Sequence, residues 1–259
     1  MATVISSISR QGAYEPFELQ VSRGQIQGHR NVTVFGFNGD VDQTQVSVWP
    51  LPSLITFPAS AIQMTVSSTS ANDTSAGTGA RTVVVQGLDA NYNEVTETVT
   101  LNGQTAVTMT ASLLRVNYAY VATAGSGNSA AGSIYIGTGV VTAGVPATTY
   151  DIIKLDYNVT TTGSYTIPAG YTGYVSQGLF SAGQPSGSTQ VEGRLLLRGT
   201  NNIRMTEAIT TLNNGVANYV FEYPLAVPEK TTVEATAIAS ANNNAVSSLF
   251  IILLVKEGP

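Results

Sequence analysis

In Val95-Thr96-Glu97-Thr98-Val99-Thr100-Leu101, threonine occupies every second position, and the positions between are apolar except for Glu97. In an extended strand, this spacing places Val95, Val99 and Leu101 on one face and the three threonines on the other. Threonine and valine lose rotamer freedom in helices and fit the pleated surface of a sheet. The stretch therefore predicts a β-strand with one buried face and one polar face.

Turn signals stand on both sides of this strand. Before it, residues 89–93 (Asp-Ala-Asn-Tyr-Asn) predict a hairpin with the apolar run at 83–85. After it, Asn102-Gly103 predicts a second hairpin, with residues 106–110 as the partner strand. The sequence around residue 95 thus predicts antiparallel pairing.

Short strands and turn clusters recur along the rest of the chain. Further strands are expected at residues 32–35, 115–121, 133–136, 164–167, 171–179, 191–198, 203–209, 219–223, 232–240 and 249–255. A strand every 8–12 residues or so is typical of sandwiches and jelly rolls. No stretch shows an apolar 3.6-residue period over three helical turns. We therefore expect an all-β chain, with an N-terminal extended arm followed by two β-sandwich domains of jelly-roll or immunoglobulin-like type.

The expected arm occupies residues 1–50, the first sandwich domain 51–150 and the second 151–259. The arm holds the only histidine, His29, and the only tryptophan. It ends in Trp49-Pro50-Leu51-Pro52, a stiff connector, because proline restricts its own φ and the residue before it.

The composition excludes several functional classes. Only 10% of residues are charged and the formal net charge is −5, so the chain lacks the basic surface of a nucleic-acid binder. The longest apolar stretch, residues 249–255, is too short to cross a bilayer, and we expect no membrane partner. The chain has no cysteine, which excludes disulfides, thiolate metal sites and cysteine nucleophiles.

Few residues offer catalytic or metal-binding chemistry. His29 is the only candidate general base, and no Gly-x-Ser-x-Gly motif accompanies it, so we expect neither an enzyme nor a cofactor. Asp40 and Asp42 are spaced like the start of a calcium loop, but Gln45 and Leu51 stand where an EF-hand needs Gly and Glu. The two aspartates are a candidate loop cation site, with an ordinary Asx-rich turn as the alternative.

The shortage of charge itself points to assembly. A free monomer usually keeps many surface charges and protects its edge strands with lysine, but this chain has three lysines. Neutral faces can be desolvated against a neighbour at lower cost than charged ones. A neutral, well-hydrated monomer is the alternative. The candidate assembly contacts are Arg23, His29, Phe35, Trp49 and Ile251.

Residues 249–255 (Leu-Phe-Ile-Ile-Leu-Leu-Val) are apolar on both faces of the expected strand. Such a strand is expected to be central and covered on both sides, or buried at a subunit contact. Ile251→Asp is therefore expected to prevent folding or assembly.

Three parts of the chain resemble virion structural proteins of tailed, largely aquatic bacteriophages. The similar segments are VSRGQIQGH at 21–29, FGFN at 35–38 with DVD at 40–42, SANDTSAGTGAR at 70–81 with GLDANY at 87–92, and YTIPAGYTGY at 165–174. The resemblance implies a component of the virion, and it carries no catalytic signature and no functional residues.

The leading hypothesis is a non-enzymatic, homo-oligomeric phage structural protein, with trimers decorating or cementing the capsid or binding at the neck. Its partners would be copies of itself and the major capsid or neck and tail proteins, in a virion assembled in the host cytoplasm. The alternative is a tail fibre or tail appendage that binds a host receptor or glycan through tyrosines such as Tyr118 and Tyr171. A third hypothesis is a β-sandwich polysaccharide hydrolase.

Overall fold

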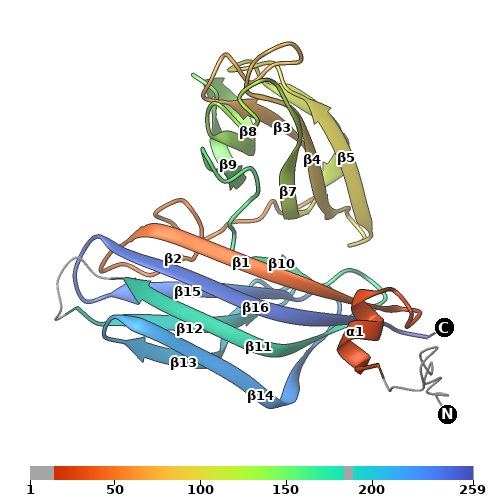
Figure 1. Cartoon of the computed structure of the whole chain (residues 1–259), viewed down its shortest axis with the longest axis vertical. Coiled ribbons are helices and arrows are strands. Elements are labelled where there is room, and N and C mark those ends of the chain that lie inside the picture. Colours follow the sequence, from red (N-terminus) through yellow and green to blue (C-terminus); the bar gives the residue numbers. More distant parts are fainter. Residues whose placement is uncertain (1–14, 184–188, 259) are drawn as a thin grey trace.

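The computed structural model describes residues 15–183 and 189–258, and its regular structure is almost entirely β-strand (Figure 1). The predicted all-β class is confirmed. In these residues, strands β1 to β16 form four antiparallel sheets around two hydrophobic cores. The helix α1 (Phe17–Ser22) precedes them. No helix in the described part of the chain is long and apolar enough to cross a membrane.

Two of the sheets form a unit that we call the large sheet pair. In its first sheet, the order is β1 (His29–Val41), β16 (Asn244–Lys256), β11 (Tyr171–Gly183) and β14 (Gly215–Val227). In its second sheet, the order is β10 (Ser164–Thr166), β15 (Thr232–Ala239), β12 (Val191–Arg198) and β13 (Arg204–Leu212), and β2 (Val46–Ser47) pairs with β15. Alternate side chains of both sheets face the core between them, including Val34, Phe180, Leu195 and Phe250.

The other two sheets form the small sheet pair. Its first sheet has the order β6 (Val107–Leu113), β3 (Ile62–Ser68), β8 (Ile134–Thr142) and β9 (Val145–Ile153). Its second sheet has the order β5 (Glu94–Thr100), β4 (Ala80–Leu88) and β7 (Arg115–Ala124). The core between them contains Met64, Val85, Leu101, Met109 and Ile136.

Asp73 organises the loops at one end of the small sheet pair. Its carboxylate is fully buried and accepts four hydrogen bonds, which compensate for its desolvation. The donors are the backbone N–H groups of Ala80, Ala131 and Gly132 and the hydroxyl of Ser68. A Cβ at Gly79 would lie 2.1 Å from Oδ1 of Asp73, so a glycine is required there.

The predicted N-terminal arm is not confirmed. Residues 29–41 form β1, which pairs along nearly its whole length with β16, and β2 pairs with β15 (Figure 1). Residues 1–14 of the expected arm lie outside the described residues. A period-two pattern indicates which face of a strand is buried but not which strand is its neighbour, so pairing with the last strand of the chain was not visible. The large sheet pair is thus built from strands of both ends of the described chain.

One of the two hairpins predicted around residue 95 forms and the other does not. β4 and β5 pair across residues 89–93 as expected. Asn102-Gly103 does make a turn, with Gly103 at φ 61°, but β6 then pairs with β3 in the opposite sheet. The N–H of Gly103 donates to the carbonyl of Asp73 at 2.7 Å. This bond joins the turn to the Asp73 loop, and the chain crosses there from one sheet to the other.

The strand predicted at 249–255 lies within β16, and it is central, between β1 and β11. Its inward side chains, such as Phe250 and Ile252, are buried in the core. Its other face, with Leu249, Ile251 and Leu253, is half-buried and faces away from the core. One side of the strand is therefore covered within this chain, and the other is not.

Candidate functional site

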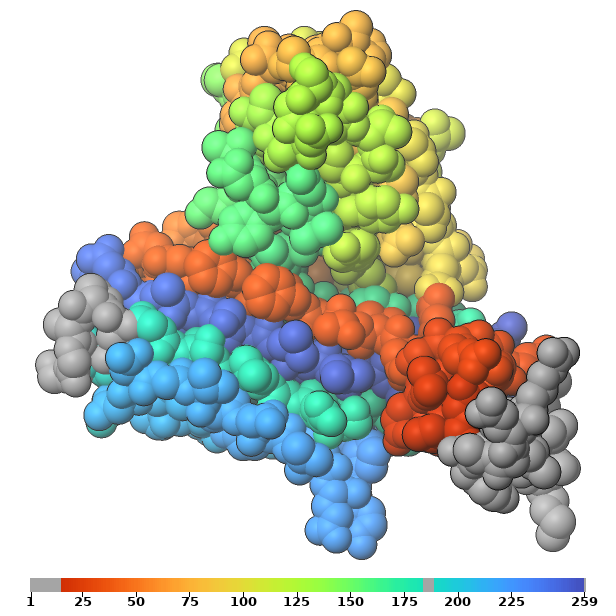
Figure 2. All heavy atoms as spheres, in the orientation of Figure 1, coloured from red at the N-terminus to blue at the C-terminus, as the bar shows by residue number. Residues whose placement is uncertain are grey.

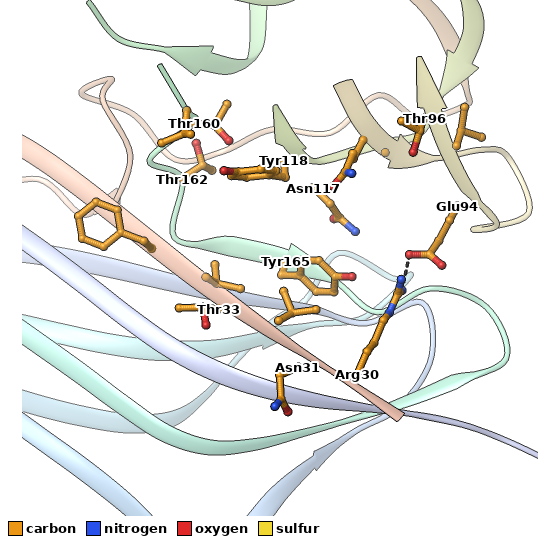
Figure 3. Close-up of a pocket in the computed structure, with 17 residues that line it drawn as sticks. Arg30, Asn31, Thr33, Glu94, Thr96, Asn117, Tyr118, Thr160, Thr162 and Tyr165 are labelled. Carbon is orange, nitrogen blue, oxygen red and sulfur yellow. Dashed lines mark hydrogen bonds and ion pairs between the residues drawn. The ribbon is translucent and has the colours of Figure 1, made fainter. Parts of the chain in front are cut away.

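A cleft of about 500 Å³ between the two sheet pairs is the main candidate binding site in the described residues (Figure 3). One side is the edge strand β1, from Arg30 to Phe35, and the opposite side is the β5-β4-β7 sheet. The third side is the connector at residues 159–165. Clefts of this volume are in the range that proteins use for small ligands.

The side formed by the small sheet pair carries a row of polar side chains. Gln86 of β4 is paired with Thr96 of β5 and with Tyr118 of β7, so the three lie side by side across the sheet. Tyr118 is 39% exposed, and its ring lies 5.8 Å from that of Tyr120. Partial burial, followed by the charge of Tyr120, raises the pKa of Tyr118. Its hydroxyl therefore stays protonated near neutral pH and can donate a hydrogen bond.

Each of these two sides contributes one charge, and the two are the only charges among the residues that line the cleft. Arg30 of β1 forms an ion pair with Glu94 of β5, drawn as the dashed line in Figure 3. The guanidinium of Arg30 also lies 5.1 Å from the ring centre of Tyr171. Because the two charges oppose each other, the cleft is polar but has no net charge.

Several contacts fix the two sheet pairs relative to each other. The side-chain amide of Asn117 donates to the carbonyl of Thr166 at 2.9 Å and accepts from the N–H of the same residue at 2.9 Å. The ring of Phe57 lies between two guanidinium groups, 4.0 Å from that of Arg115 and 4.4 Å from that of Arg198. These contacts and the Arg30–Glu94 pair hold the cleft in one shape.

Asp151 lies behind the connector side of the cleft, in β9. Its Oδ1 accepts from the hydroxyl of Thr162 at 2.6 Å and from the N–H of Ile152 at 2.9 Å. Its Oδ2 is buried without a partner in the described part of the chain. Burial raises the pKa of Asp151 to about 7, and the hydrogen bonds offset only part of that effect.

The five predicted assembly residues are not brought together in one site. Arg23 and His29 lie near α1, where Arg23 pairs with Glu15 and the ring of His29 is edge-on to that of Phe17 at 6.0 Å. Trp49 is only 2% exposed, and its Nε1 donates to the carbonyl of Ser53 at 2.7 Å. Trp49 therefore packs inside its own chain, whereas a residue at a subunit contact would have to lie on the surface.

Phe35 and Ile251, the other two, share an exposed surface of the first sheet. Cross-strand registers define three rows on it, which together we call the outer sheet face. The rows are Phe35–Leu249–Leu179–Asn218, Phe37–Ser247–Ser181–Val216 and Thr33–Ile251–Gln177–Val220, in the strand order β1-β16-β11-β14. None of these residues is charged, and most are apolar. Figure 2 looks onto this face, and α1 covers one end of the same sheet.

Further apolar side chains are exposed outside these three rows, in β14 and in the second sheet. In the pairing of β11 with β14, Val175 pairs with Leu225 and the next paired residue, Gln177, pairs with Val220. Residues 221–224 of β14 therefore have no partner on β11 and bulge from the sheet. Tyr223 in this bulge is 83% exposed. Ile203, Met205 and Ile209, on and just before β13, are also more than half exposed.

Asp40 and Asp42 do not form a metal site with other groups. Within residues 15–183 and 189–258, no three or more His, Cys, Asp or Glu side chains are grouped to hold an ion. The local turn is made by Asn38, whose Oδ1 accepts from the N–H of Asp40 at 2.9 Å, as in an Asx turn. Asp42 instead accepts a long-range hydrogen bond from the N–H of Asn243 at 2.9 Å.

Sequence reasoning did not identify most residues of the cleft. The alternation at 95–101 placed Thr96 on the polar face of its strand, and Tyr118 was named as a tyrosine that could bind a receptor or glycan. Gln86, Asn117 and Arg30 gave no signal, because the cleft exists only through the approach of β1 to the small sheet pair. That approach depends on the pairing of β1 with β16, which no local pattern encodes.

No protein-family model matches the chain, and no curated protein matches its sequence. Solved structures with weak similarity include the VP2 subviral particle of infectious bursal disease virus, at 9% identity and TM-score 0.24, covering 90% of this chain and 73% of that chain. Another is the T=1 particle derived from the same virus, at 10% identity and TM-score 0.21, covering 90% and 75%. Similarity at these TM-scores supports no conclusion about this chain's function.

Proposed function

We propose that this chain is a non-enzymatic structural component of a virus particle, and that it associates with copies of itself through the outer sheet face. One observation carries the proposal: the middle of a four-stranded sheet is uncharged and mostly apolar, and apart from the ring of Tyr157, which stacks on Phe37, nothing in the described chain is shown to cover it. Large exposed apolar patches on soluble proteins usually mark interaction surfaces. The resemblance of segments in three parts of the chain to virion structural proteins of tailed phages indicates the kind of assembly.

The sheet is large enough for a stable contact. Each of its four strands is 13 residues long. With the usual rise per residue along a strand and the usual spacing between neighbouring strands, the sheet measures roughly 43 by 19 Å, or about 800 Å². Specific interfaces bury about 800 Å² on each partner. A copy seated on most of this surface would therefore form an interface of ordinary size.

The trimer that we propose imposes a further condition. In a twofold dimer the same surface can contact itself, whereas a threefold ring needs two different surfaces on each copy. The exposed apolar side chains Ile203, Met205 and Ile209 offer the second surface. In the particle, the trimer would decorate or cement the capsid or bind at the neck of a phage virion, after assembly in the host cytoplasm.

Val220→Asp tests this proposal, because Val220 lies on the outer sheet face, is 70% exposed and makes no contribution to the core. We expect the wild-type chain to form trimers by size-exclusion chromatography with light scattering. An unpaired carboxylate in the contact costs about 3 kcal/mol, which weakens association about 100-fold and gives monomers. The matched control is Val140→Asp in β8, which is 79% exposed in the small sheet pair and should leave the trimers unchanged. A wild-type chain that stays monomeric at high concentration would overturn the proposal.

A second candidate function is binding of a host receptor or glycan by a tail appendage. The observation in its favour is that Tyr118 lines the cleft between the sheet pairs while remaining 39% exposed. Tyr171, the other tyrosine that we singled out, lies beneath the guanidinium of Arg30 at the edge of that cleft. Adsorption of the purified chain to host cells, with and without Tyr118→Ala, tests this role.

A further inference from the structure

We propose that the cleft between the two sheet pairs binds a neutral oligosaccharide, with Tyr118 as the stacking platform and Gln86, Thr96 and the Arg30–Glu94 pair as hydrogen-bonding groups. This inference rests on the second candidate function and names its site and ligand class. The outer sheet face shares Thr33 and Phe35 with the cleft lining, but the proposed ligand-binding groups Gln86, Thr96 and Tyr118 lie on the small sheet pair and outside that face.

The charge of the cleft selects the ligand class. Its lining holds one cation and one anion, Arg30 and Glu94, and they are already paired with each other. A phosphate or carboxylate ligand would find no unpaired cation among the lining residues, and an amine would find no unpaired carboxylate. A lipid would leave the polar groups of the lining unsatisfied. A neutral molecule rich in hydroxyl groups needs no charged partner, and its hydroxyls can form hydrogen bonds with the polar groups of the lining.

The lining offers the chemistry that such a molecule needs. The Gln86 amide and the hydroxyls of Thr96 and Tyr118 have no side-chain hydrogen-bond partner in the described residues, and all three residues line the cleft. Figure 3 shows Thr96 and Tyr118 on the side formed by the small sheet pair. They offer donors and acceptors in one row across the sheet. Beside them, the half-exposed ring of Tyr118 can pack against the apolar face of a sugar ring, as aromatic side chains do with apolar groups.

The cleft is held open before any ligand arrives. The paired hydrogen bonds between Asn117 and Thr166 anchor β7 to β10 directly beside Tyr118. The Arg30–Glu94 pair joins β1 to β5 across the cleft. A site that is already ordered loses little conformational freedom on binding, so modest contacts give measurable affinity.

An array of neutral glycans tests the proposal, with hyaluronan and polysialic acid as acidic comparisons. We expect the full chain to bind neutral glycans and not the acidic ones. For the neutral glycan with the strongest signal, titration calorimetry should show about tenfold weaker binding with Tyr118→Ala and a loss of severalfold with Gln86→Ala. Tyr118→Phe keeps the ring and should stay within about threefold of the wild type.

Tyr223→Ala is the matched control, because it removes a highly exposed tyrosine far from the cleft lining. It should not change glycan binding, and Tyr118→Ala should keep its near-ultraviolet circular dichroism and its oligomeric state. Absence of binding to every neutral glycan would overturn the proposal, as would binding that Tyr118→Ala leaves intact. Val220→Asp separates the two proposals, because a monomer that still binds glycan supports the cleft whatever becomes of self-association.

Discussion

Replacing Asp151 with asparagine perturbs a buried acid whose protonation is coupled to folding. The ordinary pKa of an aspartate is 3.8, and burial raises the pKa of Asp151 in the folded chain to about 7. Between about pH 4 and pH 7 the folded state therefore binds a proton that the unfolded state has released. The free energy of unfolding falls as the pH rises through this window and becomes constant above it.

The size of this effect follows from the pKa difference. At about 1.4 kcal/mol for each pKa unit, ionisation of Asp151 removes on the order of 4 kcal/mol of stability between pH 4 and pH 8. Asparagine does not ionise, and its Oδ1 can accept the same hydrogen bonds from Thr162 and Ile152. Its amide nitrogen replaces Oδ2, which has no partner in the described chain. Asp151→Asn should therefore change stability little at pH 4 and increase it by several kcal/mol at pH 8.

Urea denaturation at pH 4 and pH 8 measures this difference, with Asp40→Asn as the control. Asp40 is exposed, so the same substitution there should shift stability by less than about 0.5 kcal/mol at both pH values. All other titrating groups are common to the variant and the wild type, and their contributions cancel. An equal effect of Asp151→Asn at both pH values would refute the reasoning.

Three further predictions concern stability. Trp49→Ala removes a fully packed indole and its hydrogen bond to Ser53, so it should lower the free energy of unfolding by about 3–5 kcal/mol in urea denaturation. Because Trp49 is buried, the tryptophan fluorescence of the wild type should shift to longer wavelength on unfolding. Asp73→Ala leaves buried donors around the carboxylate unpaired and should cost about 3 kcal/mol or more, measured in the same way; a change below 1 kcal/mol would show that water satisfies them. Phe57→Ala removes the ring between Arg115 and Arg198 and should cost about 2 kcal/mol, with faster hydrogen exchange at the junction of the sheet pairs; unchanged exchange there would mean that the other contacts suffice.

The sequence predicts the local parts of this fold well. Alternation at 95–101 lies almost entirely within β5, and turn residues at 89–93 correctly join β4 to β5. These features depend on residues close in sequence. The apolar run at 249–255 predicted a central strand covered on both sides or buried at a subunit contact. The strand is central, but only one of its faces is covered by the core of this chain.

Long-range pairing limits what the sequence predicts. Val32 and Val34 have the spacing of any half-buried strand, and nothing local shows that β1 pairs with β16, more than 200 residues later. The same limit hides the cleft, since Arg30 meets Glu94 only after that pairing has formed. Trp49 was a candidate assembly contact, but it is buried within its own chain, because the core of a folded chain can include a connector.

Protection of the outer sheet face tests the central claim most directly, and the absence of cysteine makes it simple to measure. Single-cysteine variants Val220→Cys and Val140→Cys place a thiol at two similarly exposed positions, one on the outer sheet face and one in β8. In the assembled protein, we predict that a maleimide labels the Val140→Cys variant rapidly and the Val220→Cys variant slowly, with fast labelling restored on dissociation. Equal, rapid labelling of both variants in the assembled state would contradict the account.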